Sequence, residues 1–134
     1  MRTPVRLPFL LVIALCAPAC FPALLGVGAG LVLSREILAN KTYGAQIDLD
    51  AAVTWAYCKS SLTHQASYPI NVDNDLRTAT GVVGGSDVTI TVETYDDDNS
   101  RLAVYATKYG APDGEAAKTV FDGLLAYINE ASGG

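Results

Sequence analysis

The chain has 134 residues, half of them hydrophobic, which is enough for one domain with its own apolar core. Its 14 acidic residues outnumber its nine basic ones, and the net charge at pH 7 is −5. This acidity argues against nucleic acid as a partner, because phosphate backbones are bound by clusters of lysine and arginine. With three cysteines and one histidine, we expect neither a zinc site nor a bound cofactor.

Residues 1–19 have the layout of a secretory signal peptide. Arg2 and Arg6 form a basic start, an apolar stretch occupies positions 7–15, and small residues stand directly before Cys20. A cysteine in that place predicts cleavage before it and attachment of lipid to its thiol. We therefore expect a protein of the bacterial cell envelope that is anchored to a membrane through Cys20 and faces the periplasm.

The charge of the remaining chain bears on how it would meet a membrane. Residues 1–19 contain two arginines and no acidic residue, so their removal changes the net charge from −5 to −7. So acidic a surface does not dock on anionic lipid by electrostatic attraction, and any attachment must be covalent or apolar. Phe21, rather than an aspartate, follows Cys20, which favours retention in the outer membrane.

Two alternatives to a lipid anchor stay open. No charged residue occurs in positions 7–33, a stretch long enough to cross a bilayer as an uncleaved helix. Residues 17–19 also fit cleavage by an ordinary signal peptidase, which would release a secreted protein. In the lipoprotein interpretation, residues 20–40 form a lipid-anchored segment rich in glycine and alanine, with a helix over 23–39.

The pattern from residue 41 onward predicts a folded domain over 41–134. Positions 41–47 read as a first strand, and Asp48 or Asp50 is suited to cap the helix that follows. Apolar residues then recur at helical spacing until about Gln65. The members of this stripe are Ala51, Trp55, Cys58 and Leu62.

Three strands and a last helix complete the expected order. Positions 70–83 form an irregular strand with an interruption, and 87–109 alternate as a hairpin around an acidic turn. Pro112 and Asp113 open the last helix, in which Gly123 indicates close packing. The fold class is α+β, a β-α-β-β-β-α two-layer sandwich with an antiparallel sheet and both helices on one face.

The arrangement resembles a family of small bacterial envelope lipoproteins grouped as a domain of unknown function. The likeness rests on Cys20, the glycines of 26–30, the pair Arg35 and Glu36, and the strand and helix order after them. It covers nearly the whole chain from Cys20. The resemblance implies a compact α+β domain behind a lipidated cysteine. It carries over Cys20 as the one functional residue and implies no activity.

The acidic turn of the hairpin contains the nearest approach to a cation site. Asp96, Asp98 and Ser100 have the spacing of the first ligands of a calcium loop, which uses several oxygen atoms from a flexible segment. The pattern then fails, because Arg101 stands in the place of the glycine and Thr107 in the place of the bidentate glutamate. We therefore expect a solvated turn and no specific metal site.

Cys58 and His64 are the only candidates for a thiol nucleophile and its base. Such a pair must meet at hydrogen-bond distance. Six residues on one helix separate the two side chains by about 120° around the axis. Cys58 also shares the stripe of Trp55, so we expect it in the core and expect no catalysis from it.

Tyr105 and Tyr109 are the candidate contact residues. They share one parity in the last predicted strand, opposite to Leu102 and Val104. If the helices cover the leucine and valine, the tyrosines face outward, where aromatic side chains serve as anchors for a partner. The ordinary preference of tyrosine for strands explains the same residues without a partner.

Together these patterns predict a non-enzymatic envelope lipoprotein whose domain contacts an envelope protein or contributes to envelope structure. One alternative is a periplasmic module that binds a small ligand on the open sheet face around Tyr105. The other is a single-pass protein anchored by an uncleaved N-terminal helix. An enzyme ranks behind these alternatives, because no catalytic motif is present.

Overall fold

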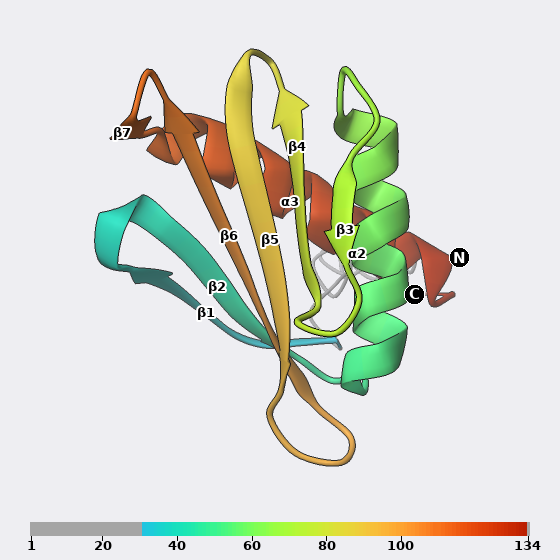
Figure 1. Cartoon of the computed structure of the whole chain (residues 1–134). Helices are drawn as coiled ribbons and strands as arrows, with labels where there is room; N and C mark the ends of the chain where they lie inside the picture. The colour runs from blue at the N-terminus through green and yellow to red at the C-terminus, as the bar shows by residue number, and fades with distance from the viewer. Residues whose placement is uncertain (1–30, 134) are drawn as a thin grey trace, which may run out of the picture.

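The computed structural model describes residues 31–133, which form one antiparallel sheet backed by two helices (Figure 1). The strands are β1 (Val32–Leu38), β2 (Thr42–Ile47), β3 (Asn71–Asp73), β4 (Thr78–Val83), β5 (Ser86–Thr94), β6 (Ser100–Lys108) and β7 (Ala111–Pro112). The helices are α2 (Ala51–Gln65) and α3 (Gly114–Ala131), and a short 3-10 turn, η2 (Ala39–Lys41), joins β1 to β2. The prediction of the α+β class is confirmed.

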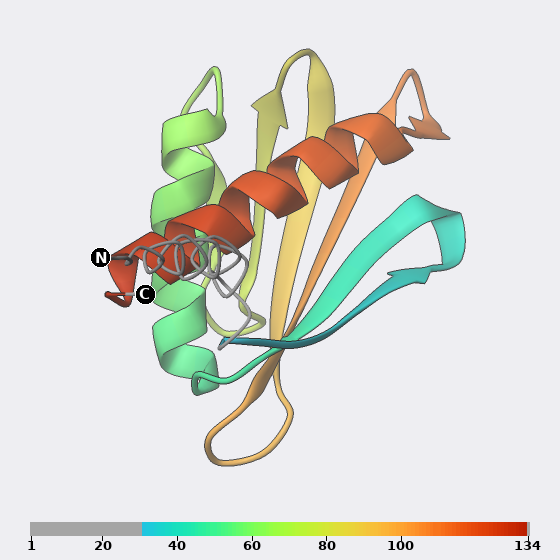
Figure 2. The same cartoon turned by 180° about the vertical axis from the view of Figure 1, so that it is seen from behind.

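The strands lie in the order β1-β2-β6-β5-β4-β3, and β7 pairs with β6 beside β2. The pairing of β2 with β6 places strands from the two ends of the domain side by side at the centre of the sheet. Figure 2 shows α2 and α3 together in front of the sheet, and Figure 1 shows the opposite face without a helix. The described domain is therefore a two-layer sandwich with one face of its sheet uncovered.

Alternation in β5 and β6 divides the sheet into a buried face and an open face. The buried face consists of Val88, Ile90, Val92, Leu102, Val104 and Ala106, each at most 1% exposed. The helices cover it with two apolar stripes: Trp55, Cys58 and Leu62 of α2, and Ala117, Val120, Phe121, Leu124, Leu125 and Ile128 of α3. Burial of one such aliphatic side chain contributes about 1.5–3 kcal/mol, and the core therefore supplies most of the stability.

Both long helices begin at an aspartate whose carboxylate accepts a backbone N–H. Asp50 Oδ1 accepts from the amide of Val53 at 2.9 Å, so Asp50 is the cap of α2. Asp113 Oδ1 accepts from the amide of Ala116 at 3.1 Å and caps α3. Pro112, expected in the first helical turn, belongs to β7 instead, and α3 starts at Gly114.

The predicted helix over 23–39 is wrong for the part that the structure describes. Residues 32–38 form β1, which pairs with β2 from Val32 opposite Ile47 to Leu38 opposite Thr42. The pairing with β2 outweighs the small-residue pattern, because it satisfies the backbone of both strands. The sheet therefore begins before residue 41. Cys20, the rest of 20–30 and the signal peptide lie outside the described residues.

The helices also contact each other, where α2 ends beside the middle of α3. A Cβ atom on Gly123 would lie 3.2 Å from the side-chain Nε2 of Gln65, so the expectation of close packing at this glycine is confirmed. Within residues 31–133, no helix is long and apolar enough to span a membrane.

Candidate contact surface

The uncovered sheet face is lined mainly by small side chains and threonines. The alternation that buries Val88 and Ile90 turns Thr89 and Thr91 to the other side. The half-buried residues of this face in β4, β5 and β6 are Thr78, Thr80, Val82, Thr89, Thr91, Ala103, Tyr105 and Thr107. We call this set the open face. Cross-strand pairs of threonine, such as Thr78 opposite Thr91 and Thr80 opposite Thr89, favour the pairing of β4 with β5.

Tyr105 is the one aromatic residue of the open face. It lies in β6 directly opposite Thr89 of β5, and it is half-buried. Since both helices lie behind the sheet, its ring is on the side that no described helix covers (Figures 1 and 2). The prediction that Tyr105 faces the side opposite to Leu102 and Val104 therefore agrees with the structure.

Tyr109 lies elsewhere, because β6 ends at Lys108. It belongs to the turn that leads into β7, with φ of 54°, and it is 97% exposed. The Lys108 Nζ lies 5.8 Å from its ring centroid. The two predicted contact tyrosines are thus on separate parts of the surface, one on the face and one at the tip of a turn.

A cavity of about 290 Å³ lies between β3, β4 and β5, and Tyr105 is not part of its lining. Thr89, which is opposite Tyr105, belongs to its lining together with Asn71, Thr80 and Asp87. Three of these four residues carry neutral polar groups, and one carries a carboxylate. The other half of the lining has no polar side chain and consists of Pro69, Gly81, Val82 and Val88. The open face therefore has a hollow between β3, β4 and β5, which Thr89 separates from Tyr105.

The Asp96 carboxylate of the acidic turn accepts hydrogen bonds from other residues of the same turn. Asp96 Oδ1 accepts from the amides of Asp98 and Asn99 at 2.9 Å each, and the Asn99 side chain donates to both Asp96 oxygens at 3.0 Å. These bonds, the Asn99 side-chain bond first, lower the pKa of Asp96. Ser100 is fully buried and donates to Thr54 Oγ1 at 2.7 Å. The turn thus does not present Asp96 and Ser100 as one set of oxygens.

Cys58 and His64 are not brought together. Cys58 is fully buried in the core, where desolvation raises the pKa of its thiol. His64 is exposed, with Nδ1 at 2.8 Å from the carbonyl oxygen of Ser60 and its ring against Tyr127. Within residues 31–133, no group of three or more His, Cys, Asp or Glu side chains is placed to hold a metal ion.

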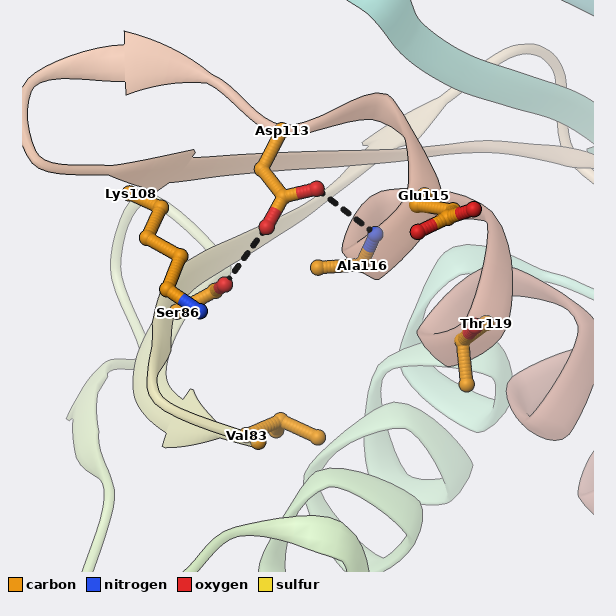
Figure 3. Close-up of a pocket in the computed structure, with 8 residues that line it drawn as sticks. Val83, Ser86, Lys108, Asp113, Glu115, Ala116 and Thr119 are labelled. Carbon is orange, nitrogen blue, oxygen red and sulfur yellow. Dashed lines mark hydrogen bonds between the residues drawn. The ribbon is translucent and has the colours of Figure 1, made fainter.

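A larger cleft, of about 460 Å³, lies where the turn after β4 meets the start of α3 (Figure 3). Asp113 accepts from Ser86 Oγ at 2.7 Å and from the Ala116 amide, and Lys108 lies on the same side of the cleft. The bond from Ser86 is the main reason that the pKa of Asp113 is lowered. Both carboxylate oxygens are occupied within the protein, so this polar group holds the fold together.

The sequence placed Asp113 at the start of the last helix but indicated neither its capping bond nor its partner Ser86. The two residues are 27 positions apart, and no local pattern connects them. The cleft itself arises from tertiary packing. Neither a protein-family model nor a curated protein matches this chain.

Proposed function

We propose that the chain is a bacterial envelope lipoprotein, tethered to a membrane through Cys20, whose α+β domain contacts another protein and catalyses no reaction. The basic start, apolar stretch and small residues before Cys20 support the tether. The periplasmic side of the outer membrane is the location that Phe21 favours. The family of small envelope lipoproteins with no known activity remains the group that the chain resembles.

The observation that carries the contact role is the position of Tyr105. It stands among threonines and Ala103 on a sheet face that no described helix covers. Small neighbours let a partner approach closely, and an aromatic ring contributes a large contact area for few rotatable bonds. A sheet face that is exposed only to water requires neither an aromatic ring among small side chains nor a hollow between β3, β4 and β5. These features favour contact with a partner over plain exposure to water.

The tether is tested by metabolic labelling with a palmitate analogue in a bacterial host. The native chain is expected to take up label, and Cys20→Ala is expected to lose it. Cys16→Ala serves as the matched control, because it removes the other cysteine of the N-terminal segment and is expected to leave labelling intact. Equal labelling of Cys20→Ala would contradict the lipid anchor. An intact mass that still includes residues 1–19 would indicate the uncleaved single-pass alternative.

The contact role is tested by photocrosslinking in the same cells. A photoreactive amino acid at Thr91 probes the open face, and one at Thr63 of α2, on the helix layer, serves as the control. We expect one discrete adduct from Thr91, reduced when Tyr105 is replaced by alanine, and no such adduct from Thr63. Equal adducts from both positions, or an adduct insensitive to Tyr105→Ala, would contradict a contact through the open face.

The cavity between β3, β4 and β5 favours a second candidate, a module that binds a small polar ligand. Its neutral hydroxyl and amide groups and the carboxylate of Asp87 suit a ligand with several hydrogen-bonding groups. A thermal-shift screen of sugars and amino acids distinguishes the two functions. A shift that disappears in Thr80→Val supports the ligand module, and a flat screen together with the Thr91 adduct supports the protein contact.

A further inference from the structure

The two edges of the sheet differ in length and in protection. Among the described strands, β3 closes one edge with three residues and β1 closes the other with seven. Exposed apolar side chains are concentrated on β1, where Leu33, Ile37 and Leu38 are 49%, 69% and 39% exposed. An edge strand leaves every second N–H and C=O group unpaired, and proteins usually protect a long edge with proline, a bulge or several charges. β1 has an irregularity between Val32 and Ser34 and two charged residues, Arg35 and Glu36, but from Ser34 to Leu38 it has no proline and no bulge.

A groove runs beside this edge on the helix side of the sheet. It has a volume of about 300 Å³ and lies between β1 and α3. The Tyr43 and Phe121 rings form its aromatic part, with centroids 5.7 Å apart, and Ile37 adds an exposed aliphatic side chain. Figure 2 shows β1 at the edge of the sheet beyond β2, with α3 on the viewer's side of the sheet. An added strand at β1 would therefore place every second side chain at this groove.

Two cations, Arg35 and Lys118, and two carboxylates, Glu36 and Asp122, line the groove, and Arg35 forms no salt bridge with any described residue. Lys118 Nζ binds Asp122 Oδ2 at 2.8 Å, and this is the one salt bridge within residues 31–133. The Arg35 guanidinium lies 5.9 Å from the Phe121 ring centroid and has no carboxylate partner there. A cation on an apolar aromatic wall attracts a carboxylate more strongly than a cation in open water does, because the local dielectric is lower.

We propose that β1 is a docking edge, at which an extended segment of another protein adds as an antiparallel strand with a carboxylate opposite Arg35 and an apolar side chain in the groove. The main-chain hydrogen bonds of the added strand supply affinity, and the side chains facing the groove supply specificity. The proposal goes beyond the contact role of Tyr105, because it uses a different surface.

The alternation of β1 defines the side chains that the segment needs. Arg35 is opposite the buried Ala45 and Ile37 is opposite Tyr43, so both face the helix layer, whereas Glu36 is opposite Gly44 and faces the open side. In an antiparallel segment, the residues opposite Leu38, Ile37, Glu36 and Arg35 follow one another along the chain. Charge and apolar matching then predict the order apolar, apolar, basic, acidic.

The same alternation argues against a second copy of this chain as the occupant. If two β1 strands paired about a two-fold axis, each residue would lie opposite a residue of the other strand that faces the same side of the sheet. The two registers that pair most of β1 are centred on Arg35 or on Glu36, and each puts a like charge directly opposite itself. Registers centred further along run into η2 or into the irregularity between Val32 and Ser34. A segment with an acidic residue opposite Arg35 and a basic residue opposite Glu36 therefore matches β1 better than a second β1 strand does.

The test uses the full chain in mild detergent and a fluorescent peptide, acetyl-Thr-Leu-Val-Lys-Glu-Val-Thr-amide, measured by anisotropy. We expect saturable binding that weakens at least tenfold in Arg35→Glu and returns when the peptide carries lysine in place of its glutamate. Arg101→Glu makes the same charge change on the open face and is expected to bind the peptide like the native chain. A peptide N-methylated at alternate residues is expected to lose binding, because it cannot form the edge hydrogen bonds.

Three results would overturn the proposal: no saturable binding, equal binding of the N-methylated peptide, or equal affinities of the native chain and Arg35→Glu. Circular dichroism of each variant checks that the fold is retained. A concentration-dependent dimer in sedimentation that is abolished by Ile37→Glu would instead make a second copy the occupant, and would also overturn it. Tyr105→Ala is expected to leave peptide binding unchanged, so a failure of the open-face contact and a failure of this edge are distinguishable.

Discussion

Ser86 Oγ donates to Asp113 Oδ2 at 2.7 Å, which connects the first residue of β5 to the cap of α3 across 27 positions of the chain. Ser86 is only 2% exposed, and the other Asp113 oxygen already accepts from the Ala116 amide. One carboxylate thus orients the last helix over the sheet and satisfies a buried hydroxyl.

This pair makes the stability of the domain depend on pH. The pKa of Asp113 is lower in the folded chain than in the unfolded chain, so its stabilisation is complete above the unfolded pKa and disappears as the pH falls through the folded one. Asp113→Asn is therefore expected to have a lower melting temperature than the native chain at pH 7 and nearly the same one at pH 2. Thermal melts across this range check the prediction. Asp97→Asn is the control for loss of one surface charge, and an equal pH response there would contradict the role of Asp113.

Ser100 and Thr54 form a second buried pair, at 2.7 Å, between β6 and α2. Thr54→Val leaves the Ser100 hydroxyl buried without its acceptor, and is expected to cost about 1–3 kcal/mol of unfolding free energy. Ser100→Ala is expected to cost less, because Thr54 still lies near the Leu49 carbonyl oxygen. A double-mutant cycle by urea denaturation should show a coupling of about 1 kcal/mol. Strictly additive losses would contradict a direct bond.

Gly81 of β4 has no room for a side chain. A Cβ atom there would lie 2.9 Å from Ile70 Cγ2, so Gly81→Ala is expected to destabilise the domain by about 1–3 kcal/mol through overpacking. The matched test repeats the substitution in an Ile70→Ala background, where the added methyl group has space. Equal losses in both backgrounds would show that the cost has another origin.

The Cys58 thiol is expected to be unreactive in the folded chain. It is fully buried, so a reagent cannot reach it in the folded chain. Burial also raises the pKa of the thiol, so little of the reactive thiolate is present. In a chain with Cys16 and Cys20 changed to serine, a thiol reagent at pH 8 should react with Cys58 only after denaturant is added. A second chain with an added cysteine at the exposed Thr63 is the positive control. Rapid reaction of Cys58 without denaturant would contradict its place in the core.

The parts of the fold that the sequence predicted are those where local alternation and burial coincide. Val88, Ile90 and Val92 alternate with threonines, and β5 is a strand with that face buried. The strand β1 was missed because its apolar start continues a long apolar run, and only its pairing with β2 reveals its structure. The sequence assigned Tyr109 to the same face as Tyr105 because the alternation of side chains in the strand was continued past Lys108. The strand ends there, and Tyr109 has a positive φ in the turn that follows. Contacts such as Ser86 with Asp113 depend on tertiary packing.

The central pairing of β2 with β6 joins Tyr43 to Val104, and it has a kinetic consequence. The N-terminal hairpin cannot take its place in the sheet until β6 has been synthesised, when more than three quarters of the chain exists. Non-local pairing of this kind slows folding, because a long loop must close before its contacts form. The complete sheet of this chain therefore forms only late in synthesis, which is consistent with the export across a membrane that we propose.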